Sequence, residues 1–116
     1  MSKKIEYEIY RKLKDTEQIK THVIIIKPSN ANIDDLKLLG DQLKEDYKST
    51  YISAVFVFDE KLAADLLKDT DENYMPNFYS FHFVASFNRN VNTKYHRFFI
   101  HLPKEGGGEL ELFYPI

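Results

Sequence analysis

The stretch Tyr51–Glu60, which reads Y-I-S-A-V-F-V-F-D-E, is the part of the sequence that decides the fold. Its centre, Ile52–Phe58, has no charged residue, no glycine and no proline, and Val, Ile and Phe dominate it. This composition is typical of a strand that is covered on both faces. Because helix-like segments flank it and strand-like segments lie beyond them, we expect it to be the central strand of a small α+β domain.

Length and composition narrow the class of protein. The chain has 116 residues, the usual size of one domain, so we expect a single α+β domain over residues 1–116. It has no cysteine, which excludes disulfides and thiolate metal sites, and no apolar leader follows Met1. We therefore expect a cytoplasmic protein. The formal net charge of −2 provides no general attraction to nucleic acid or to a membrane, so neither is expected as a partner.

The N-terminal half predicts a hairpin followed by a helix. Apolar and polar residues alternate along Ile5–Lys14, and Ile19–Lys27 is strongly aliphatic at its centre. The short polar link between these two predicted strands indicates an antiparallel hairpin. Asn32 has the chemistry of a helix N-cap, and apolar residues then recur at helical spacing over Ile33–Lys48.

After the central strand, the sequence predicts a shorter helix and three more strands. Leucine and alanine form an apolar stripe over Glu60–Lys68, and the strands are expected at Phe78–Arg89, Lys94–Leu102 and Glu109–Tyr114. The element order β-β-α-β-α-β-β-β predicts a mainly antiparallel sheet of about six strands, with the two helices packed on one face. Besides the central strand, the helix residues expected in the core are Ile33, Leu36, Leu43, Leu62 and Leu66.

The pairing of the C-terminal strands can be predicted from their apolar faces. If Arg89 pairs with Lys94 across a four-residue turn, one face becomes continuously apolar and His82 lies opposite His101 on the other. A slip of one residue would place His and Arg among the phenylalanines, so we prefer this register. To keep its leucines on the apolar face, the last strand must place Glu109 or Glu111 beside His101.

The residues His82, His101, Glu109 and Glu111 therefore form a candidate ligand or metal cluster. Directly opposed side chains on neighbouring strands lie ~4.5–5.5 Å apart at Cβ, so two imidazoles and a carboxylate could meet. Such a set could bind a metal ion or transfer a proton. The simpler interpretation is a solvated sheet face on which these side chains pair across strands. We expect no cofactor.

Two further sets of residues are candidates for binding. Ser86, Arg89 and Arg97 lie near one turn and could hold an anion, although exposed polar turns usually bind only water. Eleven of the 17 aromatic residues lie from Tyr74 onward, and the same polar sheet face would carry Val84, Phe99 and Phe113. Apolar residues on an open sheet face indicate that something covers them, so these three form a candidate interface.

The favoured function is a non-enzymatic protein-interaction domain, which self-associates as a homodimer or binds another protein through its aromatic sheet face. The alternative is a small enzyme or a small-ligand or metal-binding protein that uses the His-His-Glu cluster. The sequence has no nucleophile elbow, HExxH motif, Walker loop or dinucleotide-binding glycine pattern. No catalytic residue can therefore be assigned, and the balance is against an enzyme.

Overall fold

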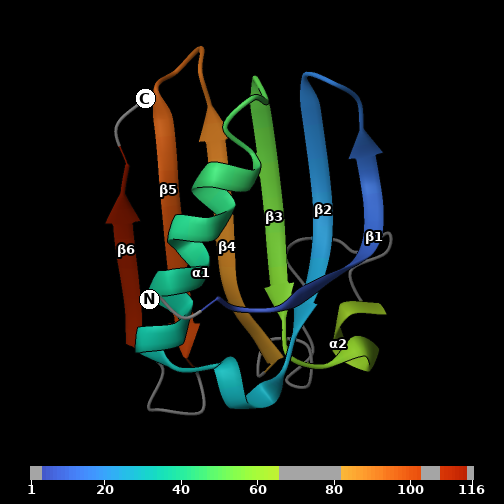
Figure 1. Cartoon of the computed structure of the whole chain (residues 1–116), viewed down its shortest axis with the longest axis vertical. Helices are drawn as coiled ribbons and strands as arrows, with labels where there is room; N and C mark the ends of the chain where they lie inside the picture. Colours follow the sequence, from blue (N-terminus) through green and yellow to red (C-terminus); the bar gives the residue numbers. More distant parts are fainter. Residues whose placement is uncertain (1–3, 66–81, 103–107, 115–116) are drawn as a thin grey trace.

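Strand β3 lies inside a six-stranded sheet whose order is β1-β2-β3-β4-β5-β6 (Figure 1). The computed structural model describes residues 4–65, 82–102 and 108–114, with the backbone alone for residues 102 and 108–110. The strands are β1 (Tyr7–Asp15), β2 (Ile19–Ile26), β3 (Ile52–Phe58), β4 (Phe83–Asn90), β5 (Tyr95–Leu102) and β6 (Gly108–Phe113). The helices are α1 (Ile33–Asp46) and α2 (Lys61–Asp65), with a 3-10 turn at Pro28–Asn30.

The sheet is mainly antiparallel, as predicted, and the order of the elements confirms an α+β fold. Among the described strands, β2 and β3 are the one parallel pair, and α1 makes the connection between them. A parallel pair needs such a crossover, whereas the other neighbours pair antiparallel. Among the described residues, no helix has the length and apolar character that crossing a membrane requires.

Helix α1 begins as the sequence predicts. The Asn32 side chain accepts a hydrogen bond from the backbone N–H of Asp35 at 2.9 Å, which satisfies one of the free amides of the first turn. Leu36 and Leu43 are fully buried, which confirms their predicted place in the core. Ile33, the first helical residue, is 41% exposed, so the expectation that it is buried was wrong.

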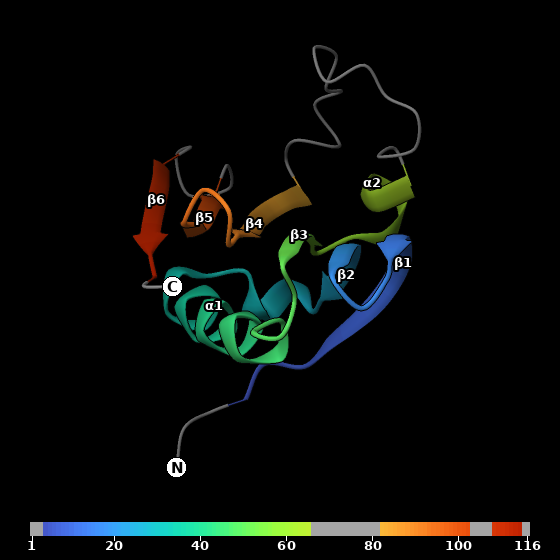
Figure 2. The same cartoon turned by 90° about the horizontal axis from the view of Figure 1, so that it is seen from above.

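The two helices pack on opposite faces of the sheet, which corrects the expectation that they share one (Figure 2). The residues facing α1 include Ile24, Ile26, Val55 and Val57, and the alternate residues Val23, Phe56 and Phe58 face α2. Because β3 is apolar on both sides, its pattern could not decide which side α2 covers.

The second helix contacts the sheet through small residues. Ala63 and Ala64 are buried against Val23 and Phe58, while Leu62 is 65% exposed. The predicted burial of Leu62 was therefore wrong, because the two alanines occupy the side of the helix that faces the sheet. Leu66 lies outside the described residues.

The pairing of β4 with β5 differs from the predicted register by two positions. Asn90 pairs with Tyr95, in place of the predicted Arg89 with Lys94, so the four-residue turn lies one residue further along the chain. Lys94 adopts a positive φ of 57°, and the Asn90 side chain accepts a hydrogen bond from the backbone N–H of Asn92 at 3.0 Å. A shift of two positions preserves which side chains share a face, so the predicted faces are confirmed from Ala85 onward while the opposed partners change.

We predict that Gly40→Ala destabilises the protein. Helix α1 crosses β5 so closely that a Cβ at Gly40 would lie 2.9 Å from Phe98 Cδ2 and would also meet Tyr114 Oη. Overpacking costs about 1–3 kcal/mol, whereas alanine gains about 1 kcal/mol in helix propensity, so the free energy of unfolding should fall by about 1 kcal/mol. Urea denaturation measures this change. Lys37→Ala, on the exposed side of α1, is the control and should be close to neutral; an equal response of the two variants would contradict the close packing.

Candidate functional site

The predicted His-His-Glu cluster is not assembled in the described structure. His82 precedes β4 and its Nδ1 lies 2.7 Å from Oδ1 of Asp59, a carboxylate that is fully buried at the end of β3. His101 instead packs on the rings of Phe83 and Phe99, with centroids 5.1 and 6.2 Å away. The described residues contain no group of three or more His, Asp or Glu side chains that could hold a metal ion.

The two glutamates of the cluster have separate places. Glu109 is the cross-strand partner of His101 in the β5–β6 ladder, which is the predicted neighbour relation at the level of the backbone. Glu111 lies opposite Phe99, and its Oε1 forms an ion pair with Arg97 Nη1 at 2.7 Å. The register shift and the bulge at Val84 together separate His82 from His101: the β4–β5 ladder ends with Ala85 opposite Ile100, and Phe83, not His82, packs on His101.

The predicted anion site is also divided between the two faces of the sheet. Ser86 pairs with Phe99 on the face opposite α1, whereas Arg89 points to the α1 side and donates a hydrogen bond from Nη1 to the carbonyl oxygen of Thr50. Arg97 shares the face of Ser86 but is already neutralised by Glu111. These residues were grouped because they lie near one turn. Alternate residues of a strand point to opposite faces of the sheet, and this separates Arg89 from Ser86 and Arg97.

The candidate interface is retained in part. Val84 is 1% exposed and belongs to the core cluster on the α1 side, so its assignment to the interface was wrong. Val57 pairs with Ala85 and Phe58 with Phe83, which leaves Val84 as the extra residue of a bulge. Because a bulge interrupts the alternation of side chains, Val84 turns inward with Ala85. Phe99 is half-buried and Phe113 is 64% exposed.

The face of β4–β6 opposite α1, here called the open face, is the most distinctive surface of the molecule. Within the described residues, α2 packs against β2 and β3 and no helix packs on this part of the sheet (Figure 2). The side chains that share it are Ser86, Asn88, Tyr95, Arg97, Phe99, His101, Glu111 and Phe113.

Arg97 is the centre of the open face. Its guanidinium carbon lies 4.5 Å from the ring centroid of Tyr95 and 4.5 Å from that of Phe113, so the group contacts the faces of both rings. The ion pair with Glu111 is a third contact that holds the Arg97 guanidinium. Cation–π contacts and a charge-assisted hydrogen bond together hold this long side chain in one position.

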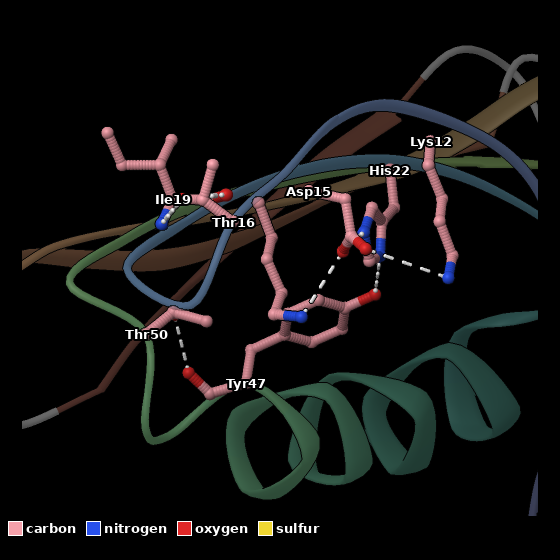
Figure 3. A network of polar contacts seen from close by, with 8 residues as sticks. Lys12, Asp15, Thr16, Ile19, His22, Tyr47 and Thr50 are labelled. Carbon is pink, nitrogen blue, oxygen red and sulfur yellow. Dashed lines mark hydrogen bonds and ion pairs between the residues drawn. The ribbon is translucent and has the colours of Figure 1, made fainter.

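A different polar network lies on the α1 side of the sheet, where it joins the buried His22 and Tyr47 to the exposed Asp15 (Figure 3). His22 is 3% exposed, its Nδ1 lies 2.7 Å from Tyr47 Oη and its Nε2 lies 2.8 Å from Asp15 Oδ1. An ionised Asp15 can only accept, so Nε2 carries the proton, and a neutral imidazole then accepts at Nδ1 from the Tyr47 O–H. Burial, followed by the charge of Asp46, raises the pKa of Tyr47 to about 12, so the phenol keeps its proton.

This network links distant parts of the chain and has a structural role. Asp15 ends β1 and also forms ion pairs with Lys12 at 3.7 Å and Lys20 at 3.2 Å. Both ring nitrogens of His22 are satisfied inside the protein, and His22 and Tyr47 are almost inaccessible to a substrate. The sequence alone does not predict this contact, because no local pattern connects His22 to a tyrosine 25 positions later.

An open pocket of about 320 Å³ lies where β1 begins. Its lining residues are Glu6, Tyr7, Glu8, Ile25, Ile26 and Lys27. Lys27 forms an ion pair with Glu6 at 3.6 Å, and the Tyr7 hydroxyl donates to Asp46 at 2.6 Å. These polar groups serve one another rather than converge on the pocket, so it is a weaker candidate than the open face.

Comparisons of the chain with protein-family models, with curated proteins and with solved structures found no match.

Two buried phenols allow a matched test of the His22 network. Tyr47→Phe leaves Nδ1 of His22 buried without its hydrogen bond, which should lower the free energy of unfolding by about 1–3 kcal/mol. Tyr114 also has a pKa raised to about 12, by burial and then by the charge of Asp41, but its Oη has no hydrogen-bond partner among the described residues. Tyr114→Phe should therefore be neutral or slightly stabilising. Equal losses in chemical denaturation would contradict the structural role of the network.

The network also predicts how stability depends on pH. The hydrogen bond from His22, and then that from Lys20, lowers the pKa of Asp15 below its ordinary value of 3.8. A carboxyl whose pKa is lowered by folding stabilises the protein above its unfolded pKa, and this contribution disappears as pH falls through the folded pKa. The difference in unfolding free energy between the wild type and Asp15→Asn should therefore be full at neutral pH and shrink below pH 3.8. Asp41→Asn is the control, and a difference that stays constant down to pH ~2 would contradict this linkage.

Proposed function

We propose that this chain is a non-enzymatic protein-interaction domain that self-associates, and that the open face is its binding surface. The observation that supports this most strongly is Phe113, which is 64% exposed beside an arginine stacked on its ring. An exposed aromatic side chain with a fixed arginine is typical of the residues that dominate binding energy in protein interfaces.

The composition of the strands supports the same proposal. The chain contains 13 lysines, yet β4, β5 and β6 contain neither lysine nor aspartate. Protein interfaces are depleted in lysine and acidic residues and enriched in aromatic residues and arginine. Glu111 is the one acidic side chain described on the open face, and Arg97 neutralises it. The described side chains of this surface can therefore lose their water without leaving an unpaired charge.

The rigidity of Arg97 is a further advantage for binding. A free arginine side chain loses about 0.5–1.5 kcal/mol of conformational entropy when an interface immobilises it. Here Tyr95, Phe113 and Glu111 already restrict its position before any partner arrives. The alternative of a small enzyme or metal-binding protein has less support, because His82 bonds to Asp59 and Glu111 to Arg97. A cytoplasmic location remains part of this proposal.

We expect the isolated chain to form a homodimer and Phe113→Glu to weaken it at least about tenfold, because a charge in an apolar contact loses its hydration. Leu62→Glu is a matched control, since Leu62 is 65% exposed and Phe113 is 64% exposed, but Leu62 lies on α2. Light scattering and sedimentation over a range of concentrations measure the dissociation constants. A homodimer that both substitutions weaken equally would contradict the open face as the binding surface, and a monomer at ~1 mM would remove self-association.

A further inference from the structure

The two edges of the sheet are built differently. At one edge, β1 pairs with β2 through two register irregularities, between Ile9 and Arg11 and between Lys12 and Lys14. Bulges and basic side chains are devices by which proteins keep an edge strand from pairing with another chain. At the other edge, β6 pairs with β5 without any irregularity from Gly108 to Phe113.

The regular ladder determines which backbone groups of β6 point away from the sheet. The backbone N–H of Tyr114 donates to the carbonyl oxygen of His96 at 2.8 Å, which identifies that pair as hydrogen-bonded. Hydrogen-bonded pairs alternate along an antiparallel ladder, so Leu110 and Leu112 also bond to β5. The N–H and C=O groups of Glu109, Glu111 and Phe113 therefore point outward, where no described strand lies beside β6.

We propose that β6 pairs antiparallel with β6 of a second copy, so that one continuous sheet runs through both chains. This inference rests on the self-association in the proposed function and places the contact at the β6 edge, which borders the open face. A second copy is the occupant favoured by the geometry, since antiparallel pairing of identical strands creates a two-fold axis and is complete at two chains. In the combined sheet, β1 of each copy forms an outer edge. The register irregularities and basic side chains of β1 discourage pairing with another chain, which limits further growth.

Charge selects the register of this pairing. Residues whose backbone groups point outward must face one another across the two copies. A two-fold axis through Leu110 would place Glu109 opposite Glu111 of the second copy, and an axis through Glu111 would place Glu111 opposite its own equivalent. An axis through Leu112 instead places Glu111 opposite Phe113 of the second copy, and no carboxylate faces another. Like charges directly opposed across strands are destabilising, so the axis through Leu112 is favoured.

Contacts on the open face already hold Glu111 and Phe113 in place for this pairing. The carboxylate of Glu111 lies 2.7 Å from Arg97 Nη1, so the arrival of a second strand leaves no unmatched charge. The Phe113 ring is already stacked on the same arginine and is the most exposed aromatic side chain near this edge. The pairing would also join the open faces of the two copies side by side on one surface.

A proline at position 111 tests the backbone specifically. Glu111→Pro and Glu111→Ala both remove the carboxylate, but only the proline removes the outward N–H, and proline is accepted at edge positions whose N–H faces solvent. We expect Glu111→Ala to retain the dimer and Glu111→Pro to weaken it at least about tenfold. Circular dichroism and thermal melts of the monomers establish that both variants are folded. Equal dissociation constants for the two folded variants would overturn the inference.

Hydrogen exchange of the unmodified chain gives an independent readout that needs no variant. The amides of Glu111 and Phe113 should exchange at least about tenfold more slowly in a concentrated sample than in a dilute one, whereas that of Leu112 should be protected in both. A dimer in which these two amides stay fast, but which Phe113→Glu disrupts, would overturn edge pairing and leave the open face as the binding surface. A chain that is monomeric at ~1 mM would overturn edge pairing together with self-association.

Discussion

The constraint on which the structure depends is that β3 has to be covered on both of its faces. Val55 and Val57 pack into one hydrophobic cluster beneath α1, and Phe56 and Phe58 belong to a second cluster beneath α2. Burying a large apolar side chain stabilises a fold by about 1.5–3 kcal/mol, so neither face of this strand can be left to water. The two helices are consequently divided between the two sides of the sheet, and each side receives one.

This division explains why the open face exists. Helix α1 is long enough to cover β4 and β5 on its side, where Gly40 lies against Phe98. The described part of α2 has five residues and packs near β2 and β3. Strands β4–β6 are thus covered by a helix on one side, and on the other they present Tyr95, Arg97 and Phe113 held by contacts among themselves. Where no described helix covers the sheet, these side chains form an ordered surface.

The sequence predicted the features that follow from the alternation of apolar and polar residues. It did not predict those that depend on the backbone conformation of a turn or on contacts between residues far apart in the sequence. The strands and α1 follow from periodicity, and the Asn32 cap follows from its side-chain chemistry. The faces of β5, and of β4 from Ala85 onward, were right because the register error was an even number of residues, but the bulge reversed Phe83 and Val84. The register itself depended on Lys94 adopting a positive φ, which a lysine gives no reason to expect. The side covered by α2 was undecidable from a strand that is apolar on both faces. The contact of His22 with Tyr47 joins elements that no local pattern relates.

The single parallel pair in the sheet has a consequence for how the chain assembles. Every antiparallel neighbour of β1 or β5 is close in sequence, so those hairpins can close in about 1–10 μs. Ile19 meets Ile52 only after the whole segment that contains α1 has been brought back across the sheet. The pairs of β2 with β3 join residues 33 positions apart, and those of β3 with β4 join residues 25–38 positions apart. Pairing across such long loops loses more chain entropy than closing a hairpin, so we expect β3 to join its two neighbours after the hairpins have formed.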